Sequence, residues 1–391
     1  MARACIIRQY HYPLDPRVRR EAEALEMLGH EVDVICLRRS GEPRRERRGL
    51  VTVYRLPLTH RRGGGLRYLF EYGVFLLAAA VLVTTLHLRR RYDLVQVNTM
   101  PDVLVFAALG PRLLGARVLL DLHECMPEFF ATKFGLDARH PAVRLVALVE
   151  QASIRFADRC FTCTEQMREA FLARGAQHDK VAIVLNAADE SLFDRTAYPP
   201  APRDPERLGL ICHGSVERLY GLDTVIRAVA LLRPELPNLT LKIYGEGTML
   251  EELRELTAQL DVGDAVYISG EFVPIEELLS AISAADAGVV AMRRDAFRDL
   301  VHCHKMYDFI AMGKPVICSG TRSVEAYFDE GCFQFFTADD ENDLARAIRQ
   351  LYNEPDLGER MVQRTAEISE PYCWEHQRRV YQAVAMELLK A

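Results

Sequence analysis

The chain of 391 residues has no surplus of positive charge, since 49 Lys and Arg stand against 55 Asp and Glu, a formal net charge of −6. A general nucleic-acid binder needs a basic surplus to contact phosphates, so this balance argues against that function. Short repeats and low-complexity tracts are also missing. With 49% hydrophobic and 27% charged residues, the composition is that of an ordinary folded protein, and the length predicts two domains.

The sequence lacks the marks of export and of a disulfide framework. Its first residues have neither the apolar run nor the small-residue cleavage site of a signal peptide, so we expect a cytoplasmic protein. Cysteines such as Cys5, Cys36 and Cys212 lie in strand-like runs, as buried cysteines of a reducing compartment do. Cys160 and Cys163 form a C-x-x-C motif, but side chains three apart on a strand point to opposite faces. No second ligand pair follows at zinc-finger spacing, so we predict no metal site.

Strand-like and helix-like segments alternate along the first half of the chain. Asp15 followed by Pro16 is typical of a helix start, with a carboxylate N-cap and proline at the first helical position. Strands are predicted at residues 4–7, 31–37, 51–56, 94–98, 117–122, 159–164 and 181–185, and helices at 17–28, 103–114, 142–157 and 165–174.

The same alternation starts again after residues 198–207, which are too rich in proline for either element and are predicted to be an interdomain linker. Strands are predicted at residues 209–213, 239–244, 266–269, 288–292 and 315–318, and helices at 222–232, 249–260, 275–284, 305–312 and 324–328. Such alternation predicts parallel sheets with helices on both faces, and ligands bind beyond the carboxyl ends of such strands.

The predicted organisation is therefore α/β, with two facing domains and a cleft between them. Residues 1–197 form the N-terminal domain and residues 208–370 the C-terminal domain. Residues 371–391 are expected to form a C-terminal helix that can pack back on the N-terminal domain.

Residues 38–91 combine three arginine clusters with an uncharged, apolar stretch at residues 72–88. About 17 apolar residues is the lower limit for a membrane span. However, the strand at 94–98 should join the same sheet as the strand at 4–7, so a span here would divide one domain across the bilayer. We favour a membrane-associating hairpin at residues 61–91, in which an apolar helix lies in the membrane interface and the flanking arginines lie near anionic headgroups. A buried core helix and a true span are the alternatives.

Two glycine-containing loops follow predicted strands of the C-terminal domain. Gly214 and Ser215 lie in the first loop, where a glycine lets backbone N–H groups approach a phosphate closely. Arg218 of the same loop can neutralise the charge that develops on a departing diphosphate. Glu246 lies in the second loop, which follows the next strand. An ordinary strand-to-helix turn is the alternative for each loop.

The segment 305–316 is a more specific indication of nucleotide binding. Lys305 and Asp308 are three residues apart, so they share one face near the start of a helix. A carboxylate at that place can accept hydrogen bonds from both hydroxyls of a ribose, while the lysine can reach a phosphate. Gly313 then ends the helix, and Pro315 begins the next strand.

This segment resembles the signature of retaining GT-B glycosyltransferases of family 4, in which a glutamate usually stands at the position of Asp308. The resemblance covers nearly the whole chain. The matching segments are residues 15–21, Asn98 with Pro101 and Asp102, residues 121–124 with Pro127 and Glu128, Asn186 with Asp189 and Phe193, residues 213–221, and residues 293–297. The arginine-rich apolar segment is similar to that of family members that act on lipid-linked acceptors in bacterial surface-polysaccharide assembly.

The resemblance implies two facing Rossmann-like domains and the retaining transfer of a hexose from a nucleotide sugar, with UDP-sugars as the first choice. It implies a lipid-linked or glycan acceptor at the cytoplasmic face of the cell membrane, anionic lipids as partners, and no metal or other cofactor. The implied donor-binding residues are Gly214, Ser215, Arg218, Glu246, Lys305 and Asp308, and the implied catalytic residues are His123, Arg218, Lys305 and Asp308. Asp15, Arg17 and Asn98 would border the acceptor.

Three departures from the family pattern concern the donor site. The acid expected eight residues before Asp308 is Leu300, with Asp295 and Asp299 as substitutes. Tyr220 stands where many members carry a phosphate-binding lysine. His302 and His304 form an unusual pair before the helix, and we expect them to pack or to form hydrogen bonds rather than bind a metal.

Two other functions are compatible with the sequence. A soluble nucleotide-sugar epimerase or hydrolase has the same architecture but has no use for a membrane segment. A non-catalytic membrane-bound partner of glycosyltransferases would explain Leu300 and Tyr220, but not the presence of Lys305, Asp308, Arg218 and His123 together. His123 also has a structural alternative, as a histidine satisfied by hydrogen bonds at the end of an internal strand.

Overall fold

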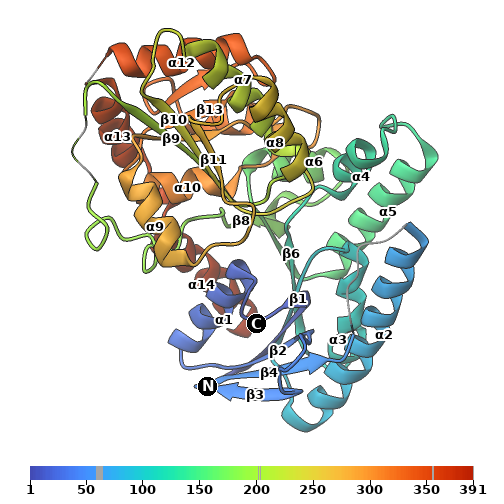
Figure 1. The fold of residues 1–391 in the computed structure, drawn as a ribbon. Helices are drawn as coiled ribbons and strands as arrows, with labels where there is room; N and C mark the ends of the chain where they lie inside the picture. Colours follow the sequence, from blue (N-terminus) through green and yellow to red (C-terminus); the bar gives the residue numbers. More distant parts are fainter. Residues whose placement is uncertain (59–64, 201, 203, 355, 391) are drawn as a thin grey trace. The chain divides into compact units, whose positions relative to one another are not determined.

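The structure is a computed structural model that describes residues 1–58, 65–200, 202, 204–354 and 356–390. The chain forms two α/β units, Met1–Leu185 with Glu375–Ala391, and Asn186–Trp374 (Figure 1). The predicted α/β class is confirmed. Residues 186–197 group with the second unit, although the sequence suggested a boundary at residue 197, and the last helix groups with the first unit.

The first unit is built on an eight-stranded sheet with the strand order β3-β4-β2-β1-β5-β6-β7-β8. Its strands are β1 (Arg3–His11), β2 (Glu31–Leu37), β3 (Arg45–Arg48), β4 (Val51–Leu56), β5 (Leu94–Asn98), β6 (Arg117–Leu122), β7 (Arg159–Thr162) and β8 (Val181–Ile183). All neighbours are parallel except β3, which pairs antiparallel with β4. The inner strands are apolar because helices cover both of their faces. Strand β3, an edge strand of charged residues, was not predicted.

Helices cover both faces of this sheet, with α2 to α5 on one side and α1 and α14 on the other (Figure 1). The helices are α1 (Pro16–Met27), α2 (Gly65–Arg90), the 3-10 helix η1 (Asp102–Ala108), α3 (Leu109–Leu113), α4 (Met126–Phe134), α5 (Pro141–Phe156), α6 (Glu165–Ala173), the 3-10 helix η2 (His178–Lys180) and α14 (Trp374–Lys390). The start of α1 is as predicted, because the Asp15 carboxylate accepts hydrogen bonds from the backbone of Arg17 and Val18. The single helix predicted at residues 103–114 is wrong, since a 3-10 helix precedes a short α-helix there.

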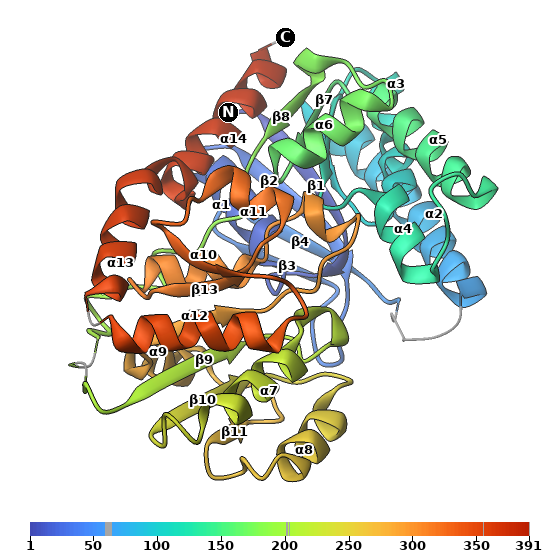
Figure 2. The ribbon, with the colours of Figure 1, turned by 90° about the horizontal axis from the view of Figure 1, so that it is seen from above.

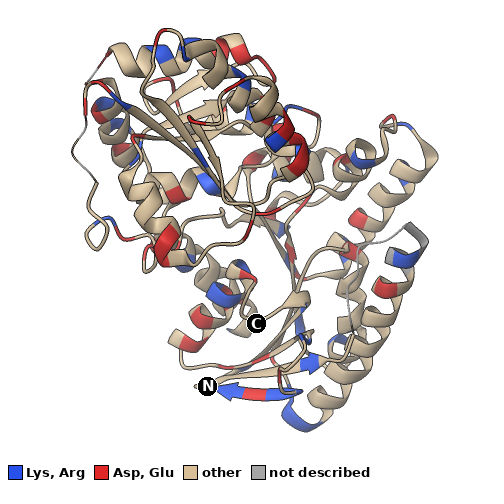
Figure 3. Cartoon of the chain, in the orientation of Figure 1, with Lys and Arg blue, Asp and Glu red and all other residues tan. Residues whose placement is uncertain are grey.

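The apolar helix expected within residues 61–91 is present as α2, which is one continuous helix over the described residues rather than a hairpin; residues 61–64 lie outside them. One face of α2 is buried, at Phe75, Ala79 and Val83, and the other is exposed. The segment Phe70–Arg90 is long and apolar enough to cross a membrane by length and composition, and only 22% of its most apolar stretch is buried. Figure 3 shows the charges of α2 near its two ends.

The second unit has a six-stranded, fully parallel sheet with the strand order β11-β10-β9-β12-β13-β14. Its strands are β9 (Leu208–His213), β10 (Leu239–Tyr244), β11 (Val266–Ile268), β12 (Ala287–Val290), β13 (Val316–Ser319) and β14 (Phe333–Phe336). The helices are α7 (Leu222–Leu232), α8 (Leu250–Gln259), α9 (Ile275–Ala284), α10 (His304–Ala311), α11 (Arg322–Tyr327), α12 (Glu341–Asn353) and α13 (Leu357–Ile368), with the 3-10 helices η3 (Arg218–Tyr220), η4 (Arg298–Leu300) and η5 (Glu370–Tyr372).

Two hydrophobic cores lie on the two faces of this second sheet. Residues of α7, α8 and α12 form one core, and residues of α9, α10 and α11 form the other. Figure 2 shows the helices and strands of this unit from above. Because all strands are parallel, their carboxyl ends meet at one edge, where the loops after β9 and β10 and the start of α10 come together.

Candidate functional site

The two glycine loops of the second unit are joined by backbone hydrogen bonds. The N–H of Gly214 donates to the carbonyl of Tyr244 at 2.8 Å, and the N–H of Val216 donates to the carbonyl of Glu246 at 2.8 Å. Gly245 has a φ of 147°, and a Cβ there would lie 1.8 Å from the carbonyl oxygen of Gly214. Only glycine fits this position, so its missing side chain lets the loops after β9 and β10 touch.

Lys305, in the first turn of α10, extends along these loops. A Cβ on Gly214 would lie 2.5 Å from Lys305 Cε, so that glycine leaves the space that the lysine chain occupies. Lys305 Nζ lies 3.1 Å from the centre of the Tyr220 ring. Burial lowers the pKa of Lys305, while Cys303, Cys212 and Asp308 act in the opposite direction. Tyr220, which stands where many family members carry a lysine, thus gives the Lys305 ammonium an aromatic ring to pack against.

Asp308 lies one turn further along α10, and its side chain is buried beside the last residue of β9. Its Oδ2 is 3.6 Å from Nε2 of His213. Burial, with Lys305 and His304 nearby, lowers the pKa of His213 to about 3, so the ring is neutral at pH 7. The predicted common face of Lys305 and Asp308 is therefore present at the carboxyl edge of the sheet.

The other predicted donor residues are on the surface of the second unit. Gly214, Ser215 and Glu246 are exposed in the two loops. The Arg218 side chain is 73% exposed, and its Nη2 lies 3.6 Å from Oε1 of Glu252. Within the second unit, Arg218 therefore reaches solvent, whereas Lys305 is only partly exposed.

Neither proposed substitute for the acid at position 300 faces this site with a free carboxylate. Leu300 is buried. Asp299 accepts a hydrogen bond from the backbone of Arg322 and pairs with Arg294. Asp295 caps the backbone of Phe297 and Arg298 and pairs with the Arg298 side chain. Both carboxylates instead stabilise the conformation of their own loop, through backbone hydrogen bonds and ion pairs with nearby arginines.

His302 packs in the core, as expected for a structural histidine. Its Nδ1 accepts a hydrogen bond from the Tyr307 hydroxyl at 2.7 Å, and its Nε2 donates to the Ser323 carbonyl at 3.2 Å. Burial lowers its pKa to about 4. Among the described residues, no group of three or more His, Cys, Asp or Glu side chains is placed to hold a metal ion.

In the first unit, His123 stands at the carboxyl end of β6. Its Nε2 lies 2.7 Å from Oδ2 of Asp121, and its own backbone N–H donates to Oγ1 of Thr99. Burial lowers the pKa of His123, although Asp121 acts to raise it. The neutral ring therefore donates from Nε2, which leaves Nδ1 as a hydrogen-bond acceptor without a partner among the described residues.

Arg17 and Asn98 lie beneath His123 and hold Asp121. Two guanidinium nitrogens of Arg17 bind the two oxygens of Asp121 at 2.7 and 2.8 Å. The Asn98 amide donates to Asp121 at 2.8 Å and to Glu21 at 2.7 Å. Burial raises the pKa of the Asp121 carboxyl, but Arg17 and His123 outweigh it and hold that pKa well below its usual range. Arg17 and Asn98 therefore position Asp121 and His123. The role at the border of the acceptor, which the sequence suggested for them, stays a prediction.

Asp15 lies at the edge of this network. Its carboxylate caps α1 and also accepts a hydrogen bond from Nε of Arg8 at 2.8 Å. The structure thus brings together the four candidate residues of the first unit, Asp15, Arg17, Asn98 and His123, through the ion pair between Arg17 and Asp121.

Several residues of this site have no role that the sequence predicts. Asp121 and Glu21 are charged residues within buried segments, and that was the available signal, since a buried charge needs a partner. Tyr381 of α14, which donates to Oε1 of Gln96 at 2.6 Å, gave no local signal at all. Glu124 follows His123, and burial raises the pKa of its carboxyl to about 8, with Arg8 acting to lower it.

Fold and site together define the class of protein. Two α/β units with largely parallel sheets, each with polar residues gathered at the carboxyl ends of its strands, are the arrangement of GT-B glycosyltransferases. Residues 14–187 match the family described as a glycosyl transferase 4-like domain, and residues 197–368 match the family of glycosyl transferases group 1. The chain therefore belongs to the glycosyltransferases of GT-B fold.

Individual relatives are distant. The chain is 28% identical over 257 residues to a D-inositol 3-phosphate glycosyltransferase of Streptomyces scabiei, which covers 61% of this chain and 55% of the relative. The match thus spans about half the length of that protein. Among solved structures, sucrose-phosphate synthase of Thermosynechococcus elongatus covers both chains fully, with a TM-score of 0.77 and 19% identity. HepE of Anabaena in complex with UDP and glucose also covers both chains fully, with a TM-score of 0.72 and 14% identity.

Proposed function

We propose that the protein transfers a hexose from a nucleotide sugar to a lipid-linked glycan in bacterial surface-polysaccharide synthesis, with retention of the anomeric configuration. One observation carries the proposal. The ammonium of Lys305 and the carboxylate of Asp308 lie on one face of α10, beside two loops that only glycine can bring into contact. A cation and a carboxylate spaced in this way suit the diphosphate and the ribose of one nucleotide.

The donor is bound by the second unit. Asp308 accepts hydrogen bonds from the ribose hydroxyls, and Lys305 contacts the diphosphate, with the exposed Arg218 closing on it when the nucleotide is bound. Gly214, Ser215 and Glu246 line the nucleotide pocket. UDP is the first nucleotide to test, because a solved GT-B structure similar to this chain contains it.

The acceptor side is supplied by the first unit. Nδ1 of His123 accepts a hydrogen bond from a hydroxyl of the transferred sugar, while Asp121 fixes the orientation of the ring. The acceptor hydroxyl attacks from the face that the diphosphate leaves, and its proton passes to a phosphate oxygen. Lys305 and Arg218 stabilise the negative charge of the departing diphosphate, so this scheme requires no metal ion. Retention is proposed from the resemblance of residues 305–316 to a retaining family.

We place the protein in the cytoplasm, bound to the inner face of the cell membrane through α2. The outward side chains Phe70, Leu77, Val81 and Leu88 are each between 66% and 71% exposed. The opposite face packs into the first unit, so α2 lies in the membrane interface more readily than it crosses the bilayer. Arg67 near one end of the helix, and Arg89 and Arg91 at and just beyond the other, meet anionic headgroups.

A thermal-shift series with UDP-, GDP- and ADP-sugars tests the donor site. We expect stabilisation by one nucleotide class, and its loss in Asp308→Asn, with affinity roughly tenfold or more lower because charge-assisted hydrogen bonds are removed. Asp264→Asn is the matched control, since that carboxylate is exposed and pairs with Arg233 away from the site. The donor site would be refuted if no nucleotide sugar stabilised the protein and Asp308→Asn behaved as the control does.

Transfer itself is tested with the stabilising donor and a membrane lipid extract. We expect a glycolipid product whose anomeric configuration, measured by NMR, matches that of the donor, and undiminished activity in EDTA. An inverted product would contradict retention, and loss of activity in EDTA that added Mg²⁺ restores would contradict the metal-free scheme. Conversion of the donor without any acceptor product would indicate an epimerase or hydrolase instead.

A further inference from the structure

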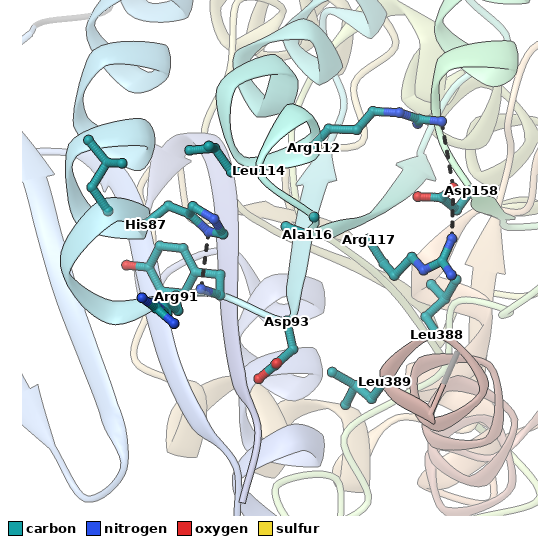
Figure 4. Close-up of a pocket in the computed structure, with 13 residues that line it drawn as sticks. His87, Arg91, Asp93, Arg112, Leu114, Ala116, Arg117, Asp158, Leu388 and Leu389 are labelled. Carbon is teal, nitrogen blue, oxygen red and sulfur yellow. Dashed lines mark hydrogen bonds and ion pairs between the residues drawn. The ribbon is translucent and has the colours of Figure 1, made fainter.

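The first unit has a second polar site, at the opposite edge of its sheet from His123. A cavity of about 830 Å³ lies at the amino ends of β5 and β6, bounded by the end of α2, the end of α3 and the last turn of α14 (Figure 4). Strand β6 separates it from the candidate acceptor site by its whole length, roughly 16 to 20 Å at 3.3 Å per residue. The cavity is therefore separate from the site proposed for the reacting sugar.

Three arginines line this cavity, namely Arg91, Arg112 and Arg117, against two aspartates, Asp93 and Asp158. In Figure 4, Arg112 and Arg117 approach Asp158 from two sides. Their nitrogens lie 3.6 and 3.9 Å from Oδ1 of Asp158, beyond the range of a good hydrogen bond. The pairing is loose, so both guanidinium groups keep donors for a ligand.

The two carboxylates are partly occupied by the backbone. Oδ2 of Asp158 accepts a hydrogen bond from the N–H of Val118 at 2.7 Å, and Oδ2 of Asp93 accepts one from the N–H of Arg3 at 2.8 Å. These bonds fix the aspartates as parts of the wall and reduce their capacity to neutralise three arginines.

Two of the arginines have donors that the described residues do not satisfy. Nη1 of Arg112 has no hydrogen-bond partner among the described residues, but protein atoms cover it, and the guanidinium lies over the Phe156 ring, 4.8 Å from its centre. The Arg91 side chain has neither a hydrogen bond nor an ion pair within the described part of the chain. Arg91 takes a left-handed backbone conformation, with a φ of 53°, just after α2. Its neighbour Tyr92 donates its backbone N–H to Nδ1 of His87, which ties this turn to the helix.

We propose that this cavity binds a phosphate group, carried by an anionic membrane lipid. An unpaired arginine, Arg91, beside two arginines that share one carboxylate at long distance, is the chemistry that recognises a phosphate. Leu88 and Leu114, which line the cavity, are 66% and 54% exposed, and Leu88 continues the outward apolar face of α2. The acyl chains of a lipid whose phosphate lies in the cavity can extend along this apolar surface, which favours a lipid over free phosphate as the ligand.

Phosphate binding at this cavity is a function separate from sugar transfer. Only the identification of the phosphate carrier as a membrane lipid rests on the proposed membrane location. The phosphate site gives the enzyme a fixed orientation on the membrane, because one lipid headgroup is held at the amino edge of the sheet while the acceptor site lies at the carboxyl edge.

The test compares the full-length protein with Arg91→Gln and with the double variant Arg112→Gln/Arg117→Gln. Arg144→Gln and Arg139→Gln/Arg144→Gln are the matched controls, because they remove the same charge from exposed arginines at the start of α5. Arg91 has no partner to lose, so its variant tests binding without a folding defect. Co-sedimentation with phosphatidylcholine vesicles that contain phosphatidylglycerol is measured, together with calorimetric titration of inorganic phosphate.

We expect the double variant to bind the anionic vesicles roughly tenfold more weakly than its control, and Arg91→Gln to bind more weakly than Arg144→Gln. Saturable binding of inorganic phosphate that the pocket variants lose, with unchanged vesicle binding, would support the phosphate site but overturn the lipid as its source. Equal loss in pocket and control variants, or none in either assay, would overturn the site. The nucleotide-sugar thermal shift, measured on the same variants, should not change, and this separates failure here from failure of the proposed transferase.

Discussion

Single glycines determine how the candidate donor site of the second unit is built. Gly245 lets the loop after β10 touch the loop after β9, and Gly214 leaves room for the Lys305 side chain. Lys305 in turn rests on Tyr220, so the position of its ammonium depends on residues from three segments. A methyl group at one of these glycines therefore displaces the Lys305 side chain or separates the two loops.

We predict that Gly245→Ala destabilises the protein by about 3 kcal/mol and weakens nucleotide binding, because alanine clashes with a backbone carbonyl and disfavours the positive φ. Gly263→Ala is the control, since a Cβ there meets no atom within 4 Å. That change should be neutral or stabilise by about 0.5 kcal/mol through the unfolded state. Urea denaturation and nucleotide titration measure both effects, and equal behaviour of the two variants would contradict the predicted contact.

Two buried histidines of the second unit predict a loss of stability in mild acid. The pKa values of His302 and His213 are lowered by burial to about 4 and about 3. The unfolded chain takes up these protons near pH 6.5, whereas the folded chain does not. Stability is therefore complete above pH 6.5 and falls as the pH decreases, by roughly 2 kcal/mol per histidine at pH 5.

His302→Gln tests this prediction, because glutamine can keep one hydrogen bond but cannot gain the proton. The variant should be less stable than the wild type at pH 7 and should lose less stability between pH 7 and pH 5. Fluorescence of the single tryptophan, Trp374, follows unfolding in denaturant at each pH. Parallel curves for the two proteins would show that His302 does not carry the effect.

At the level of helices and strands, the local sequence pattern was sufficient to predict the strands whose residues are mostly buried. The sequence predicted Glu31–Leu37, Val51–Leu56, Leu94–Asn98 and Arg117–Leu122 with the bounds that the structure has, because buried parallel strands are continuous apolar runs. It missed β3 because Arg45–Arg48 carries only charged side chains, and edge pairing with β4 overrides that composition.

The site could be predicted only in part, for a similar reason. Lys305 and Asp308 are close in sequence, so their common helical face could be inferred. The pairing of Arg17 with Asp121 joins residues far apart in the chain and depends on the strand order of the sheet. No local pattern specifies that order, so the support that Arg17 gives to Asp121 and His123 could not be inferred from the sequence.

For helix α2, we predict that Leu77→Gln/Val81→Gln binds anionic vesicles roughly tenfold or more weakly than the wild type, because two apolar side chains no longer enter the interface. Both residues are exposed, so the free energy of unfolding should change by no more than about 0.5 kcal/mol. Leu231→Gln, an exposed leucine of the second unit, is the control. Wild-type binding should also fall with added salt.

Vesicle binding that neither the double variant nor salt reduces would contradict contact through this face. A large loss of stability would instead show that the outward face of α2 is covered in the protein, as in the alternative of a buried core helix.

At the scale of the whole molecule, the first unit is built from two separate parts of the chain, residues 1–185 and the C-terminal helix α14. Helix α14 follows the entire second unit but packs in the first, where Tyr381 is fully buried and donates to Gln96. Gln96 donates in turn to Glu21, which accepts from Asn98. The network that supports His123 therefore includes a residue from the end of the chain, so the first unit is complete only when α14 has docked.

We predict that Tyr381→Phe destabilises the first unit by about 1 to 3 kcal/mol, because the buried carbonyl oxygen of Gln96 loses its donor while the ring keeps its contact with Phe161. Hydrogen exchange should show lower protection in β1 and β5, with unchanged protection in β9 and β10. Nucleotide binding by the second unit should not change, and Tyr267→Phe, at an exposed position, should affect neither unit. Loss of protection in both units to the same extent would mean that α14 stabilises the chain as a whole, and would contradict its assignment to the first unit alone.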